Sequence, residues 1–292
     1  RWGLSGSSAG TTSAMSVYGG ASVGGATTHT QTENYNGTSW SEIADLATGK
    51  TYLAGASTAP AALVFGAGPA PQNQQTEEFS VPSTASVAQE GQVWYNTSSQ
   101  VLKGFKLTPG TGAWSAGGAM NTTRAQCAGA GSQSAGIVAG GVEPAGSVNS
   151  ETYDGSTWSE GNNLSSVRMQ QAGTGGGPQS SALSISGMIT TTNVTNVESW
   201  NGTSWTETAD VNTARHQGGG AGDSNTSGMF FGGESPGTRH DNTETFNGTS
   251  WTEVADLNTG RTMISGGGPL SGAMGIAGST DGTATSFSAL AE

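Results

Sequence analysis

Short apolar runs that end in glycine alternate with polar segments along the whole chain. An apolar run of four to eight residues, bounded by glycine and polar residues, is typical of a buried strand. Six such runs occur, at residues 14–20, 61–66, 135–141, 182–187, 228–233 and 272–278. They predict six copies of one strand, each within a repeat unit of its own.

Each unit opens with a basic residue and a segment of small residues, which precede the apolar run. The basic residues are Arg1, Lys50, Arg124, Arg168, Arg215 and Arg261. They lie 44 to 49 residues apart, except for 74 residues between the second and the third. The small residues predict a first strand that is crowded against its neighbours. A period of this length indicates a fold built from copies of one small unit.

After a polar loop, each of five units carries a Glu and, two residues later, an aromatic residue. The pairs are Glu33/Tyr35, Glu77/Phe79, Glu151/Tyr153, Glu198/Trp200 and Glu244/Phe246. A spacing of two places both side chains on one face of a third strand. We expect the aromatic side chains to pack in the core, with ligand stacking as the alternative. We expect the Glu to bond the backbone or the opening basic residue, with a catalytic carboxylate as the alternative.

In four units Asn-Gly or Asp-Gly follows the aromatic residue directly, and a Trp comes five residues after that aromatic. The turns begin at Asn36, Asp154, Asn201 and Asn247, and the tryptophans are Trp40, Trp158, Trp205 and Trp251. Asn-Gly favours a hairpin with a type I′ turn, in which two successive residues have positive φ. The pattern predicts a tight hairpin that leads into a fourth strand, with the large Trp packed between neighbouring units.

Four short antiparallel strands, with an apolar face that one unit cannot bury alone, describe a propeller blade. We therefore predict a single all-β domain over residues 1–292, a six-bladed β-propeller. The sixth unit runs through residues 285–287 and reaches Glu292 without a hairpin signal or a Trp. We expect the sixth blade to be incomplete, unless residues upstream of Arg1 complete it.

The second unit breaks the repeat in another way. Phe79 and Trp114 lie 35 residues apart, where the other units have five. The difference predicts an insert at about residues 80–111 in blade 2, with a hairpin around residues 96–100. The insert is either a loop decoration or an element that docks a partner or a second subunit.

Composition excludes several classes of partner. With nine Lys and Arg and a net charge of −12, the chain lacks the clustered cations that nucleic-acid binding needs. No apolar run approaches the about 20 residues of a membrane-spanning helix, so we expect no membrane insertion. Cys127 is the only cysteine, which rules out an intrachain disulfide and favours a buried, small apolar role for it.

Motifs that carry chemistry are hard to find. His29, His216 and His240 are isolated along the sequence, without the spacing of metal ligands, and we expect solvated loop residues, no metal and no cofactor. No nucleophile elbow, phosphate loop or dinucleotide fingerprint is present. A pair of carboxylates for glycoside hydrolysis could form from any of the 21 acidic residues, and none stands out. We therefore assign no catalytic residues, and the binding residues are unknown.

Loops between the second and third strands vary most from unit to unit. They occupy residues 21–31, 67–75, 142–149, 188–196 and 234–241. In a propeller these loops emerge on one face, together with the connections between blades. They are the candidate ligand surface, although unconstrained solvated loops would vary in the same way.

The units resemble the kelch repeat. They share its Arg-opened first strand, its apolar strand ending in Gly-Gly (as at Gly232-Gly233), its aromatic residue and its Trp on the last strand. The wording Asn-Gly-Thr-Ser-Trp-Thr-Glu-x-Ala-Asp-x-Asn-Thr-x-Arg, at residues 201–215 and 247–261, is similar to kelch-like structural proteins of marine bacteriophages. The Glu-Gly-Gln-Val-Trp-Tyr-Asn segment at residues 90–96 is similar to segments of phage tail and fibre proteins.

This resemblance implies a non-enzymatic structural protein located in the virion, as a tail, fibre or capsid-surface component. Its implied partners are other virion proteins, with a host-surface glycan or receptor as a candidate ligand. Two other classes remain open: a carbohydrate-active propeller enzyme, such as a glycan hydrolase or lyase, and a bacterial surface adhesin. A copper oxidase is disfavoured, because that site would need two His ligands and a Cys-Tyr pair.

Overall fold

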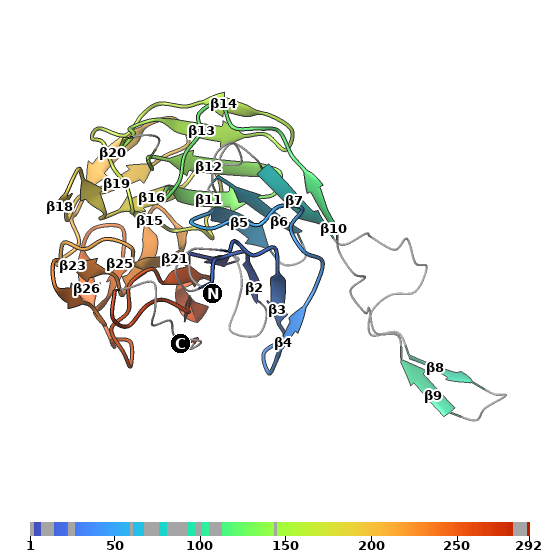
Figure 1. Ribbon diagram of the computed structural model, residues 1–292. Helices are drawn as coiled ribbons and strands as arrows, with labels where there is room; N and C mark the ends of the chain where they lie inside the picture. The colour runs from blue at the N-terminus through green and yellow to red at the C-terminus, as the bar shows by residue number, and fades with distance from the viewer. Residues whose placement is uncertain are drawn as a thin grey trace.

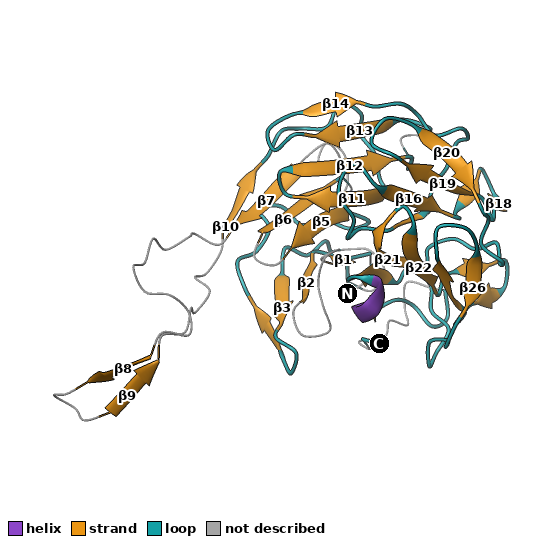
Figure 2. Ribbon diagram, turned by 180° about the vertical axis from the view of Figure 1, so that it is seen from behind, coloured by secondary structure: helices purple, strands orange, loops and turns teal. Residues whose placement is uncertain are grey.

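The computed structural model describes residues 3–6, 15–22, 27–58, 61–66, 76–80, 93–96, 101–104, 113–142, 145–282 and 291–292. Short antiparallel sheets are arranged radially around a central axis, as Figures 1 and 2 show. The predicted all-β propeller class is confirmed. The helix η3 (Leu270–Gly272) is a single 3-10 turn.

Five sheets have four strands each, in chain order from the axis outward. Blade 1 contains β1 (Ser5–Gly6), β2 (Met15–Tyr18), β3 (Thr32–Tyr35) and β4 (Trp40–Glu42). Blade 2 contains β5 (Ala54–Thr58), β6 (Ala61–Phe65), β7 (Thr76–Ser80) and β10 (Ala113–Ala116). Blade 3 contains β11 (Ala128–Ser132), β12 (Ala135–Ala139), β13 (Ser150–Tyr153) and β14 (Trp158–Glu160). Blade 4 contains β15 (Ala172–Gly173), β16 (Ala182–Ile185), β19 (Val197–Trp200) and β20 (Trp205–Thr208). Blade 5 contains β21 (Gly219–Ser224), β22 (Ser227–Phe231), β25 (Thr243–Phe246) and β26 (Trp251–Glu253).

The prediction of six blades is wrong in number, because the structure has five four-stranded blades. The sixth unit forms a two-stranded sheet of β27 (Ser265–Gly267) and β28 (Met274–Ile276). Ala291 pairs with Ile276 on the outer side of β28, whereas residues 285–287, our expected third strand, lie outside the described residues. This unit lacks the Asn-Gly and Trp signals that accompany a fourth strand in the other units. The inner strands still close a ring, since β27 contacts both β21 and β1.

The insert in blade 2 is confirmed by the pairing of β7 with β10, in which Phe79 faces Trp114. Between them, β8 (Val93–Asn96) and β9 (Val101–Gly104) form the expected hairpin. In both views this hairpin lies outside the ring of sheets.

The hairpins between third and fourth strands are confirmed, but the predicted type I′ turn is wrong. Tyr35 pairs with Trp40, so four residues form the connection. The glycine has positive φ, 91° at Gly37, while the preceding Asn does not. Instead, the Asn36 Oδ1 atom accepts hydrogen bonds from the backbone N–H groups of Thr38 and Ser39, both at 3.0 Å. The side chain thus replaces a backbone turn partner, as Asn and Asp commonly do.

Tryptophan side chains on the fourth strands of blades 3 and 5 pack between blades, as predicted, whereas the prediction is wrong for Trp40 of blade 1. Trp158 of blade 3 contacts Phe65 of blade 2 edge to face, with ring centroids 5.1 Å apart. The Trp251 Nε1 atom of blade 5 donates to the Ala209 carbonyl beyond blade 4, at 2.9 Å. Trp158 and Trp251 are 5% and 7% exposed, whereas Trp40 of blade 1 is 36% exposed.

Candidate functional site: the channel and its mouth

Buried ion pairs join the repeated Glu to the opening basic residue in the second to fifth units. The N–O distances are 3.7 Å for Lys50–Glu77, 2.6 Å for Arg124–Glu151, 3.1 Å for Arg168–Glu198 and 2.6 Å for Arg215–Glu244. The carboxylates also accept backbone N–H groups from the loop entering the blade, as Glu244 does from Asn212 at 2.7 Å. This confirms our expectation for the Glu and gives it a structural role, anchoring the connection between blades.

Glu292 takes the same role in the sixth unit. Its carboxylate lies 2.6 Å from Arg261 Nη2 and accepts the Asn258 N–H group at 2.6 Å. Our sequence reasoning did not identify this residue. The available signal for a partner of Arg261 was the segment at residues 258–261, which repeats the Asn-Thr-x-Arg motif of residues 212–215.

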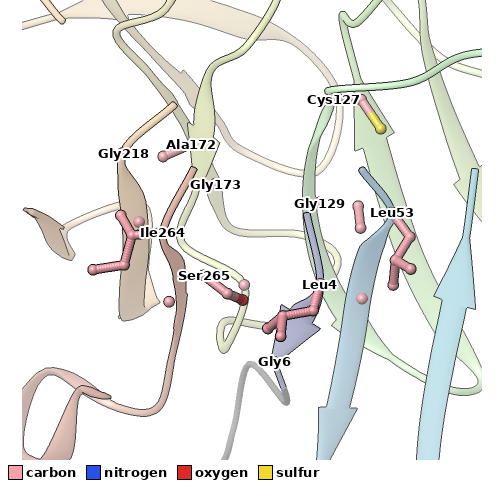
Figure 3. Close-up of a pocket in the computed structure, with 16 residues that line it drawn as sticks. Leu4, Gly6, Leu53, Cys127, Gly129, Ala172, Gly173, Gly218, Ile264 and Ser265 are labelled. Atoms are coloured by element: carbon pink, nitrogen blue, oxygen red, sulfur yellow. The ribbon is translucent and has the colours of Figure 1, made fainter. Parts of the chain in front are cut away.

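Glycines of the innermost strands enclose a channel cavity of about 130 Å³ along the axis, which Figure 3 shows. A Cβ atom on Gly220 would collide with the carbonyl oxygen of Gly173, and one on Gly266 would collide with that of Gly220. A Cβ on Gly173 would lie 2.7 Å from the Gly129 carbonyl oxygen. The inner strands therefore approach backbone to backbone, which confirms the crowding predicted from their small residues.

A second cavity of about 120 Å³ forms the mouth of this channel and shares Leu4, Leu53, Cys127, Gly218 and Ile264 with it. We define the mouth ring as the six lining residues that stand two positions after each opening basic residue. They are Gly3, Tyr52, Gln126, Gln170, Gln217 and Met263. All six have left-handed backbone geometry, with φ between 53° and 60°. Five of them are not glycine, and such residues rarely adopt this conformation.

Backbone hydrogen bonds connect successive members of the mouth ring. The N–H group of Gln170 donates to the Gln126 carbonyl at 3.0 Å, and that of Gln217 donates to the Gln170 carbonyl at 3.0 Å. Tyr52 N–H donates to the Gly3 carbonyl at 2.7 Å. The left-handed conformation thus turns these connections so that the backbone of one bonds that of the neighbouring blade.

The side chains that line the mouth are uncharged. Gln171, which is 6% exposed, donates Nε2 to the Ala139 carbonyl at 2.8 Å. The buried Oε1 atoms of Gln170 and Gln171 accept no hydrogen bond within the described part of the chain. Burial raises the pKa of the Cys127 thiol to about 11, against the opposing effect of Arg124, so this thiol stays protonated near neutral pH.

His216, which precedes Gln217 of the mouth ring, lies in a polar cluster. Its Nδ1 atom is 3.0 Å from Asn193 Oδ1 and its Nε2 atom is 3.3 Å from Glu234 Oε1. Burial lowers the pKa of His216, and the nearby Glu234 carboxylate opposes that shift. The expectation of an isolated, solvated histidine is therefore wrong here, because backbone pairing of His216 with Glu234 joins residues that are far apart in the sequence.

His240 also has side-chain partners, with its Nε2 atom 2.8 Å from Ser235 Oγ. No group of three or more His, Cys, Asp or Glu side chains that could hold a metal ion occurs among the described residues. No helix in the described part of the chain is long and apolar enough to cross a membrane.

Loops that vary between units surround the mouth. Backbone bridges tie them to the residue before each mouth-ring member: Ala125 to Val142, Met169 to Met188, and His216 to Glu234. Two loops form small hairpins, β17 (Met188–Ile189) with β18 (Thr192–Asn193) and β23 (Glu234–Ser235) with β24 (Thr238–Arg239). Residues 23–26, 67–75 and 143–144 of our candidate surface lie outside the described residues.

Comparisons with known proteins support the fold. No protein-family model matches the sequence, and no curated protein sequence matches it significantly. The solved structure of YjhT is similar to this chain, with a TM-score of 0.68 and 12% sequence identity over 100% of this chain and 94% of that one. At this identity the likeness shows a shared fold, which places the chain among the β-propellers.

Proposed function

We propose that the protein is a non-enzymatic structural protein of a bacteriophage virion, a kelch-like tail, fibre or capsid-surface component that binds a host receptor or glycan. The repeated sequence motif at residues 201–215 and 247–261, which is similar to that of kelch-like bacteriophage proteins, supports the virion assignment. The scarcity of cations supports partners other than nucleic acid.

One observation carries the binding role: the two faces of the propeller differ in how strictly they repeat. On one face, four units share the same Asx turn, for example at Asn201 and Asn247. On the other face, the loops around the mouth differ in length and pairing, as the hairpin β17–β18 and the single bridge from Val142 to Gly146 do. A rigid scaffold that carries divergent loops on one face is the usual design of a recognition module.

Buried charges also support a non-enzymatic role. The repeated carboxylates of Glu151, Glu198 and Glu244 are buried in ion pairs that hold the blade connections. Both ring nitrogens of His216 face acceptors supplied by the protein. These groups contribute to cohesion between blades and hairpins, so their presence does not call for a reaction.

Purified phage particles test the virion assignment. Mass spectrometry should detect the protein in particles banded by density, and antibodies against it should label them. The purified protein should also compete with particles for adsorption to host cells. Absence from the particles would overturn the proposal, and release of sugars from host polysaccharide would favour a carbohydrate-active enzyme.

A pair of matched variants tests which face binds. Replacing residues 188–193 by a short Gly-Ser turn changes the loop face, and replacing the turn at residues 201–204 by that of residues 154–157 changes the opposite face. We expect the first variant to lose competition and the second to retain it. Equal competition by both folded variants would contradict the assignment of the loop face.

A further inference from the structure

We propose that the mouth ring binds a neutral sugar residue of a glycan, with the Gln126, Gln170 and Gln217 carboxamides as its hydrogen-bonding groups. The inference rests on the proposed function only in placing a ligand on the same face, and it names the chemical class of that ligand. Its support comes from three independent observations: backbone geometry, unpartnered acceptors and the absence of charge in the lining.

The choice of residues in the mouth ring is the first observation. A left-handed φ is cheapest for glycine, then for Asn or Asp, and Gly3 shows that glycine fits this position. Three successive units nevertheless place Gln there, with φ of 56°, 57° and 55°. A position that needed only the backbone turn would favour glycine. Residues held in an unfavourable conformation often mark ligand sites. Here three units accept the free-energy cost of a left-handed φ and keep the carboxamide side chain.

Hydrogen bonds fix the backbone of these residues, and one of the three carboxamides, before any ligand arrives. The backbone links from Gln126 through Gln170 to Gln217 fix the three Cα positions relative to one another. The Gln217 Oε1 atom accepts from Thr262 Oγ1 of the next unit at 3.0 Å. The Gln217 side chain, which is already ordered, loses less conformational entropy on binding.

Unpartnered acceptors are the second observation. The Gln171 Oε1 atom belongs to a side chain that is 6% exposed and lines the mouth, and it has no hydrogen-bond partner within the described residues. The Gln170 Oε1 atom is also buried without a partner. A buried acceptor without a donor is costly. Both residues line the mouth, so a ligand hydroxyl that meets the carboxamide after its side chain turns toward the cavity removes that cost. Sugar hydroxyl groups are donors of this kind.

Charge is the third observation. The side chains that line the mouth are uncharged, and the chain carries a net charge of −12. Both properties disfavour an anionic sugar, because no described residue of the lining supplies a cation to compensate its carboxylate. The mouth also offers the aromatic ring of Tyr52 and the side chain of Met263, against which the C–H face of a sugar ring can pack. The cavity volume of about 120 Å³ accommodates a ring-sized group rather than a single ion.

The test measures binding of methyl glycosides of glucose, galactose, mannose and N-acetylglucosamine by saturation-transfer NMR and calorimetry, with glucuronic and sialic acid as anionic probes. We expect at least one neutral glycoside to bind and Gln170→Gly to weaken it at least tenfold. Glycine tolerates the left-handed φ, so this variant should keep or raise the melting temperature. Gln133→Ala is the matched control, since Gln133 lies at the far end of β11 from the mouth, and it should bind normally.

Three results would overturn the inference: no neutral glycoside binds the folded protein, only the anionic probes bind, or Gln170→Gly and Gln126→Gly both bind like the unmodified chain. Failure here is distinct from failure of the proposed function. A protein that is present on particles and blocks adsorption without binding these glycosides keeps its virion role and loses the mouth site.

Discussion

Removing the Glu244 carboxylate should be among the most destabilising single changes in this chain. Its side chain is fully buried and receives three hydrogen bonds, from Arg215 Nη1 at 2.6 Å and from the Asn212 backbone and side-chain amides, both at 2.7 Å. Glu244→Ala deletes all three and leaves the buried Arg215 guanidinium without its counter-charge. The perturbation therefore acts on the blade itself and on the connection that enters it.

The expected loss of unfolding free energy is about 3–5 kcal/mol, the range for breaking a buried ion pair by removing one partner. The backbone carbonyls of Gly232 and Phe230, which also accept from Arg215 at 2.8 and 3.3 Å, keep the loss from being larger. At about 2–4 °C per kcal/mol for chains of this size, the melting temperature should fall by about 6–20 °C. Glu253→Ala is the matched control, because Glu253 faces Glu244 on the neighbouring strand and is exposed.

Calorimetry and urea unfolding measure both variants, together with Arg215→Met and the double variant. The control should stay within about 0.5 kcal/mol of the unmodified chain. The two single changes should be non-additive by at least about 1.5 kcal/mol, as for residues in direct contact. Equal stability of Glu244→Ala and Glu253→Ala, or strict additivity in the double variant, would refute the assignment of the pair as a structural anchor.

Three further predictions concern the channel, a turn and a blade interface. Gly220→Ala should lower the free energy of unfolding in urea by about 2–3 kcal/mol, since its Cβ meets the Gly173 carbonyl. Gly237→Ala, with open space around it, should lower it by only about 1 kcal/mol through its positive φ. Equal losses would contradict the backbone contact at Gly220. Hydrogen bonds from the backbone N–H of Thr157 and from the hydroxyl and N–H of Ser156 lower the pKa of Asp154 from 3.8 to about 2, so the resulting stabilisation is present above pH 3.8 and is lost as pH falls toward 2. Asp154→Asn should therefore reduce the dependence of the melting temperature on pH in that window. An unchanged dependence would count against this role of Asp154. Trp251→Phe should lower the free energy of unfolding by about 1–2 kcal/mol because the Ala209 carbonyl loses its donor. Trp40→Phe, at a 36% exposed site, should change it little. The reverse order would refute the role of Trp251 in the blade interface.

The repeat allowed much of the fold to be predicted, because period, strand type and blade packing depend on residues that recur. Spacing alone gave the aromatic residue and the Trp five residues later, and it favoured a structural role for the Glu, with the backbone and the opening basic residue as its two expected partners. The turn type could not be predicted from the sequence in this way, since the Asn36 side chain accepts hydrogen bonds from two backbone N–H groups within a four-residue connection.

The mouth ring escaped sequence reasoning for a different reason. Three of its members are Gln, but Gly3, Tyr52 and Met263 share no side-chain chemistry with them, and what unites all six is a left-handed φ that the sequence does not display. The recoverable signals were position, two residues after each opening basic residue, and the recurrence of Gln there in three successive units. His216 was misjudged because the loop that supplies Glu234 reaches it through backbone pairing, which spacing along the chain does not reveal.

Cryo-electron microscopy of intact phage particles tests the central claim most directly. The account predicts density for this propeller on the particle, with the loops at residues 188–193 and 234–239 and the mouth ring facing outward. Particles that lack the propeller, or that bury the mouth ring against another virion protein, would contradict it.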